Sequence, residues 1–215
     1  MPTLRILIES VPKKAFASAL DWPGLSRGGR DENAALEALS AALPRYAPVA
    51  EAAGQPFPLD GIVLDVVERS PGDASTQFGV PAVVAPTDRE PTSAAEAHRQ
   101  ASLVAAAWEA FDRIAAAAPE ELRKGPRGGG RDRSKIVEHV NGADTGYAAA
   151  IGRKHQFNDR AAIEAMRADV LAVLREPSDG SPIAGKKWPP RYAARRIAWH
   201  ALEHAWEIED RTERD

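Results

Sequence analysis

Two histidines lie one helical turn apart near the end of this chain, at His200 and His204. Side chains four residues apart project from one face of a helix, so both imidazoles can bind the same metal ion. Ile197 and Ile208 extend the spacing into an apolar stripe, which predicts that this face is turned toward the core. A buried imidazole needs a partner, and a metal ion or a carboxylate would supply one.

A third histidine, His139, shares a helical face with Ile136 and Tyr147 in an earlier segment. Facing helices of a bundle can bring it opposite the pair, and bundle cores do house metal sites. Three neutral imidazoles with open coordination positions form a catalytic type of site, where a divalent ion activates a water or a thiol. The competing hypothesis is that carboxylates or backbone groups satisfy three core histidines. We expect His98 on the surface and His155 in a loop.

The outer ring N–H groups of metal-bound histidines need acceptors. Four acidic side chains lie near the histidines in the sequence, and the sequence does not choose among them: Glu138, Asp144, Glu203 and Glu207.

A glycine-rich basic loop, residues 123–133, precedes a predicted helix, whose first N–H groups favour anions. Arg127 and Arg131 in this loop are therefore candidate substrate-binding residues, with a flexible solvated connector as the alternative. Arg195 and Arg196 add positive charge near the start of the last helix, and pairing with acidic neighbours is the simplest expectation for them.

Composition restricts the class of protein. The chain has 215 residues, of which 44% are hydrophobic and 27% charged, as is usual for a soluble globular protein. A net charge of -3 gives no argument for binding nucleic acid or an anionic membrane. The absence of cysteine excludes disulfides, a thiolate nucleophile and a Cys-type zinc site. Since no membrane span or signal peptide is evident, we expect a cytoplasmic protein.

The first part of the chain predicts a small α/β domain over residues 1–80. Strands are expected at 4–9, 14–20 and 61–68, the last stopped by Pro71. A helix is expected over 33–43, with Asp31 as its N-cap. Residues 81–92 are rich in proline and charge, which indicates a linker.

Residues 93–215 have a helical pattern throughout. Four amphipathic helices are predicted: one from the Ser93 cap through Ile114, then 133–151 with Asp132 as a candidate cap, 159–175 and 191–211. Four such helices with one apolar stripe each make a helix bundle. The predicted fold class is therefore α+β, a small α/β domain followed by a four-helix bundle.

Three segments of the helical region, 122–132, 136–140 and 196–210, resemble the DinB/YfiT-like superfamily of metal-binding four-helix bundles. The resemblance implies a three-histidine site at His139, His200 and His204 that holds zinc, nickel or iron. It also implies a low-molecular-weight thiol as a candidate co-substrate in transferase or isomerase chemistry. The first region, through Leu20-Asp21-Trp22-Pro23-Gly24, more distantly resembles HicB-type domains, but an accessory sheet packed on the bundle is the preferred interpretation.

The resulting expectation is a metal-dependent enzyme that acts on a small-molecule substrate by transfer, isomerisation or hydrolysis. The alternative is a non-catalytic binding or regulatory module with structural histidines. The alanine-rich first helix of the bundle fits either a homodimer interface or packing within one chain.

Overall fold

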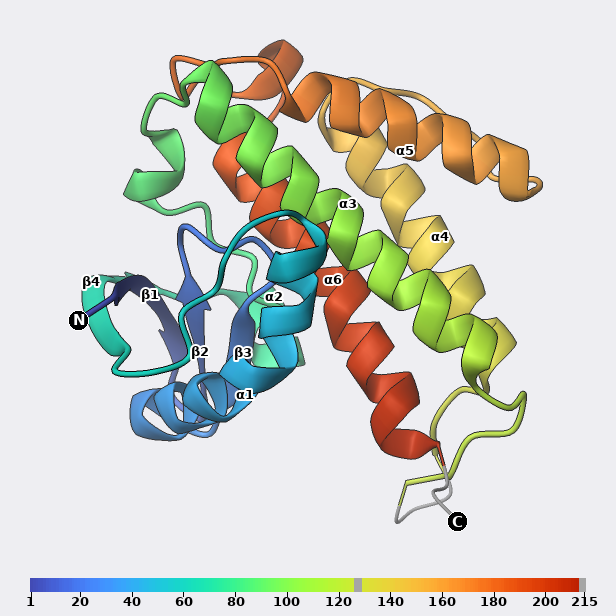
Figure 1. Ribbon diagram of the computed structural model, residues 1–215, viewed down its shortest axis with the longest axis horizontal. Coiled ribbons are helices and arrows are strands. Elements are labelled where there is room, and N and C mark those ends of the chain that lie inside the picture. The colour runs from blue at the N-terminus through green and yellow to red at the C-terminus, as the bar shows by residue number, and fades with distance from the viewer. Residues whose placement is uncertain (126–128, 213–215) are drawn as a thin grey trace.

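A four-stranded sheet and one long helix lie beside four further long helices in the computed structural model, which describes residues 1–125 and 129–212 (Figure 1). The strands are β1 (Thr3–Val11), β2 (Lys14–Ala19), β3 (Ser26–Gly29) and β4 (Val63–Pro71), in the order β3-β2-β1-β4. β2 runs antiparallel to both of its neighbours, whereas β4 runs parallel to β1. The mixed α+β class is confirmed.

Helix α1 (Glu32–Ala52) connects β3 to β4 and is longer than the sequence predicted. Its cap is the expected one, because the Asp31 carboxylate accepts a hydrogen bond from the Ala34 N–H. The predicted end at residue 43 is wrong, since the helix continues through Pro44 and Pro48. An interior proline costs about 3 kcal/mol in an isolated helix. Burial of Tyr46 and the residues around it against the core offsets that cost.

Three further details of the first region differ from expectation. Strand β3 was not predicted because Ser26–Gly29 contains no apolar residue, and helix α2 (Ala74–Phe78) was not predicted because it is so short. β4 does stop at Pro71, as predicted, but it includes Pro71 and so runs three residues beyond the predicted end at 68. β4 lies at the edge of the sheet, where a residue without an N–H group is tolerated.

Residues 81–92, the expected linker, pack against both regions of the chain. The buried Glu9 carboxylate of β1 accepts hydrogen bonds from the N–H groups of Ala82 and Val83. A short 3-10 helix, η1 (Pro86–Arg89), then presents Asp88 to Arg195 of α6 (Pro190–Arg211). The two buried side chains form a bidentate ion pair at 2.9 and 2.6 Å. The segment thus positions α6 against the sheet.

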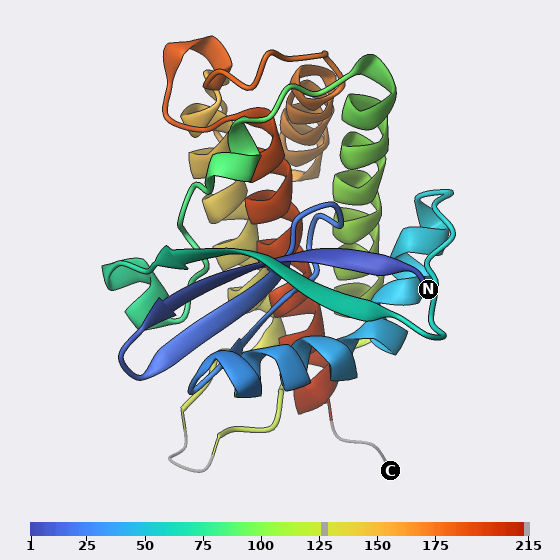
Figure 2. The same cartoon turned by 90° about the vertical axis from the view of Figure 1, so that its left-hand side faces the viewer.

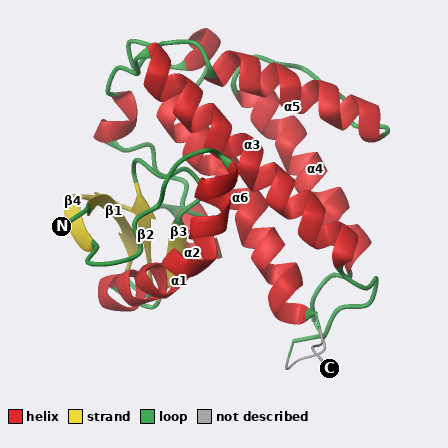
Figure 3. Cartoon of the chain, in the orientation of Figure 1, coloured by secondary structure: helices red, strands yellow, loops and turns green. Residues whose placement is uncertain are grey.

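The remaining long helices are α3 (Ala94–Ala117), α4 (Arg133–Ala150) and α5 (Arg160–Leu174), close to their predicted bounds (Figure 3). Helices α3 and α4 each pack on both α5 and α6. The predicted cap Ser93 is confirmed, Asp159 caps α5, and the Asp132 side chain does not cap α4. It accepts instead from the Leu122 N–H and pairs with Lys124. No helix in the described ranges has the length and apolarity to cross a membrane.

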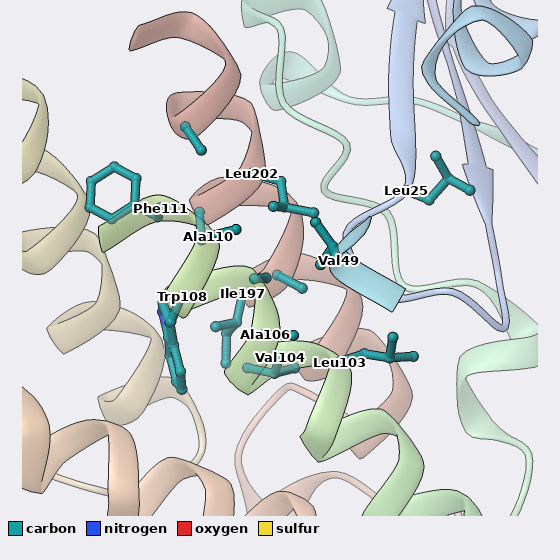
Figure 4. Packing of buried hydrophobic residues seen from close by; sticks show 14 of the residues in the cluster. Leu25, Val49, Leu103, Val104, Ala106, Trp108, Ala110, Phe111, Ile197 and Leu202 are labelled. Carbon is teal, nitrogen blue, oxygen red and sulfur yellow. The ribbon is translucent and has the colours of Figure 1, made fainter. Parts of the chain in front are cut away.

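Helix α6 contributes to one apolar core together with the sheet and the other helices. Leu202 and Ile197 lie among the alanine-rich face of α3, with Val49 of α1 nearby (Figure 4). The turn after β2 also approaches closely, since a Cβ on Gly24 would lie 2.7 Å from the Leu202 side chain. Figure 2 shows the sheet crossing in front of the long helices. This packing fixes the helix that carries two of the three candidate ligands.

Candidate metal centre

Two helices bring the three predicted histidines together. His139 comes from the first half of α4, while His200 and His204 come from successive turns of α6. The neighbours of His139 on α4, Ile136 and Val140, are fully buried, so this helix is anchored on the core. His200 is 5% exposed, and His139 and His204 are partly exposed. The cluster therefore lies at the border between core and solvent, with His200 on its inner side.

The distances among the imidazoles suit binding to one ion. The Nε2 atoms of His139 and His200 are 3.3 Å apart. Two nitrogens that are about 2.0–2.1 Å from one tetrahedral ion lie roughly 3.3–3.4 Å from each other. The candidate ligand atoms of all three histidines lie within 4.8 Å of one another, so a small side-chain rotation would equalise the distances. This set of three nitrogen donors is a fitting site for a divalent transition metal.

The electrostatic surroundings keep the imidazoles of His139 and His200 neutral. Burial lowers the pKa of His200 to about 2, with repulsion from His204 and Arg196 acting in the same direction. Burial also lowers the pKa of His139, helped by His204 and by Arg131. A metal binds only the unprotonated nitrogen of an imidazole, so both residues have the protonation state that a ligand needs.

One carboxylate orients the third histidine. The Nδ1 atom of His204 lies 2.7 Å from Glu207 Oε2, one turn further along α6. Arg211 in turn donates a hydrogen bond to the other oxygen of Glu207 at 2.8 Å. The hydrogen bond with His204 lowers the pKa of Glu207, so the carboxylate stays ionised. With Nδ1 engaged in this way, Nε2 of His204 is the nitrogen left for a metal.

The other acidic candidates for this role do not contact a cluster histidine among the described residues. Glu138 forms an exposed ion pair with Lys135 at 2.7 Å, and Glu203 pairs with Arg27 of β3 at the same distance. Asp144 is buried, and the nearest guanidinium nitrogen, on Arg167, is 3.8 Å away. Only Glu207 among the four lies within hydrogen-bond distance of a cluster histidine in the part of the chain that the structure describes.

Sequence reasoning did not assign two residues beside the cluster. The Tyr147 ring lies edge-on to His200, with ring centroids 5.5 Å apart, and the Arg196 guanidinium lies 5.2 Å from the centre of the same ring. A signal was available for both. Arg196 precedes His200 by four residues and Tyr147 follows His139 by eight, so each shares a helix face with a candidate ligand.

The two candidate loop arginines and the two remaining histidines are not part of the cluster of described ligands. Arg127 falls outside the described residues, and Arg131 is exposed in the segment before α4. The charge of Arg131 contributes to the low pKa values of His139 and His200. His98 is exposed, and His155 lies in a loop and contacts Asp169 at 3.0 Å, both as expected and both outside the cluster.

Comparisons with protein-family models, with curated proteins and with solved structures find no match to this chain.

Proposed function

We propose that this chain is a divalent-metal-dependent enzyme whose ion is held by His139, His200 and His204. The observation that carries the proposal is the convergence of three imidazole donors from two helices, with two Nε2 atoms 3.3 Å apart. Two of these histidines lack any other hydrogen-bonding partner among the described residues. A buried imidazole without a partner is costly, and a shared metal ion would remove that cost.

The number of protein ligands favours a catalytic role. Structural zinc sites are closed by four protein ligands, whereas catalytic sites keep a position open for water or substrate. The described residues supply three ligands, and two of them lie on the partly exposed side of the cluster. When bound, the ion would act as a Lewis acid. It would lower the pKa of a bound water or thiol toward neutral pH.

The chain's own groups have separate tasks in this proposal. Glu207 holds the His204 ring in one tautomer and orientation, and Arg211 keeps Glu207 in place. His200 anchors the site on its buried side, while His139 is partly exposed to solvent. Tyr147 restricts the space beside His200. A site of this kind is compatible with transfer, isomerisation or hydrolysis. The candidate ions are zinc, nickel and iron.

The resemblance to DinB/YfiT-like proteins supports the same assignment, since it places the metal on the same three residues. It also suggests a low-molecular-weight thiol as a co-substrate. The rival hypothesis of a non-catalytic module with structural histidines requires each histidine to be satisfied by the protein itself. Among the described contacts, only His204 of the three cluster histidines has a carboxylate partner.

Metal content tests the proposal directly. Untagged wild-type protein should carry close to one divalent ion per chain by elemental mass spectrometry, and a His200→Ala/His204→Ala variant should carry none. His98→Ala, which removes an exposed histidine from α3, is the matched control and should retain the metal. Circular dichroism would verify that the double variant stays folded. Equal metal content in the wild type and the double variant would refute the site.

A second measurement separates a catalytic ion from a structural one. If the ion only stabilises the fold, chelation should lower the melting temperature while added thiols leave the spectrum of a cobalt-loaded protein unchanged. A catalytic site should respond to a thiol with new charge-transfer absorption, because an open position accepts the sulfur.

A further inference from the structure

Arg196 differs from the arginine next to it in having no anionic partner in the part of the chain that the structure describes. Arg195 forms the buried bidentate ion pair with Asp88. Arg196 forms no ion pair with a described residue, and its Nη1 atom is buried without a hydrogen-bonding partner. A guanidinium in this condition has lost part of its hydration without gaining a carboxylate. The position is therefore suited to an anion from outside the chain.

Two aromatic rings hold the Arg196 guanidinium in one place. Its central carbon lies 4.8 Å from the centre of the Trp199 ring and 5.2 Å from that of Tyr147. Such cation–π contacts fix the plane of the group while leaving its N–H edges for hydrogen bonds. A planar fork held in this way is preorganised for the two oxygens of a carboxylate.

The fixed guanidinium lies beside the candidate metal centre. Arg196 precedes His200 by one turn of α6, and the Tyr147 ring contacts both side chains. On the other side, Arg196 borders a cavity of about 10 Å³ that it shares with Trp22 and Ser26. A cavity of this size holds at most one water molecule. That side has no room for an anion of substrate size, so we look for the anion on the side of Tyr147, whose ring contacts both Arg196 and His200.

A second aromatic side chain continues this wall. The rings of Tyr147 and Trp188 lie 5.3 Å apart, and both are partly exposed. Aromatic faces bind the apolar part of a small molecule, while charged groups at the edge set its orientation. The surroundings of the cluster thus combine one fixed cation with an apolar surface.

We propose that Arg196 binds the carboxylate of a small substrate whose reacting group lies at the His139–His200–His204 centre. The inference rests on the proposed function, because it assumes that the reacting group binds there. It names the substrate class as a small carboxylate with an apolar body. Arg196 is then a specificity-determining residue, distinct from Arg131 of the loop, which is exposed and has no cation–π contact with a described residue.

A pair of matched thiols tests the inference on cobalt-loaded protein. The probes are 3-mercaptopropionate and 3-mercapto-1-propanol, which carry a carboxylate or a neutral hydroxymethyl group on the same mercaptoethyl chain. The dissociation constant of each is read from sulfur-to-cobalt absorption. We expect wild type to prefer the carboxylate by about tenfold or more, as for a charge-assisted bidentate contact. Arg196→Gln should abolish the preference while the affinity for the neutral thiol stays the same, and Arg196→Lys should keep part of it.

The control is Arg175→Gln, which makes the same charge change at an exposed position at the end of α5. This variant should behave as wild type. The inference is overturned if wild type shows no preference, if Arg196→Gln keeps it, or if Arg196→Gln weakens both thiols equally, as a merely structural role would. Failure of the metal centre itself has a different signature. In that case cobalt does not bind near one equivalent, or His200→Ala binds it as well as wild type does.

Discussion

Replacing Glu207 with glutamine should weaken metal binding without removing a ligand. Glu207 Oε2 lies 2.7 Å from His204 Nδ1, and Arg211 holds the other carboxylate oxygen at 2.8 Å. The carboxylate makes the imidazole more basic and restricts its rotation, so that Nε2 points toward the other two histidines. A glutamine side chain has nearly the same shape but carries no charge, so the change isolates the electrostatic contribution.

The size of the effect follows from the type of contact. Removing an outer acceptor of a metal-bound histidine reduces metal affinity by about 10- to 100-fold. This corresponds to roughly 1.4–2.8 kcal/mol of binding free energy. Glu207 makes the one carboxylate contact to the cluster among the described residues, and Arg211 supports it. We therefore expect Glu207→Gln to weaken metal binding at least tenfold.

The same helix offers a matched control. Glu203 immediately precedes His204, yet its carboxylate pairs with Arg27 of β3 at 2.7 Å and does not contact a histidine. Glu203→Gln makes the same chemical change on the same helix, close to His204 in the sequence. Competition with a chromophoric chelator would give the zinc dissociation constants of wild type and both variants. The reasoning is refuted if Glu207→Gln binds zinc as tightly as wild type, or if Glu203→Gln weakens binding to the same extent.

Two other predictions concern buried charges away from the centre. Burial raises the pKa of Asp144 to about 7 from a usual 3.8. Between these two pH values the folded state keeps a proton that the unfolded state loses. The free energy of unfolding therefore falls as the pH rises from 4 to 7. Asp144→Asn should therefore be more stable than wild type by about 1–4 kcal/mol at pH 8 and by little at pH 4. Urea unfolding at the two pH values measures the difference. The same difference at pH 4 and pH 8 would contradict a raised pKa of Asp144. Asp88→Ala should destabilise the fold by about 3–5 kcal/mol, because it leaves buried Arg195 unpaired, and a loss below about 1 kcal/mol in denaturant titration would show that the ion pair is unimportant.

Local patterns in the sequence predicted much of the secondary structure. Strands β1, β2 and β4 and all five long helices were predicted within a few residues at most ends, because alternation, helical periodicity and caps such as Ser93 are local signals. The failures arise where packing overrides a local rule. Helix α1 passes through two prolines because the residues beyond them are buried, and β3 pairs with β2 although it has no apolar pattern.

For the candidate site, the sequence by itself determined which histidines share a helix face, since the i, i+4 spacing of His200 and His204 requires only a helix. It could not determine that His139 lies 3.3 Å from His200, because that distance depends on how α4 packs on α6. Nor could it choose Glu207 over Glu203, or show that Arg195 pairs with Asp88 while Arg196 has no anionic partner among the described residues. These outcomes depend on partners more than a hundred residues away, and only the tertiary structure brings such groups together.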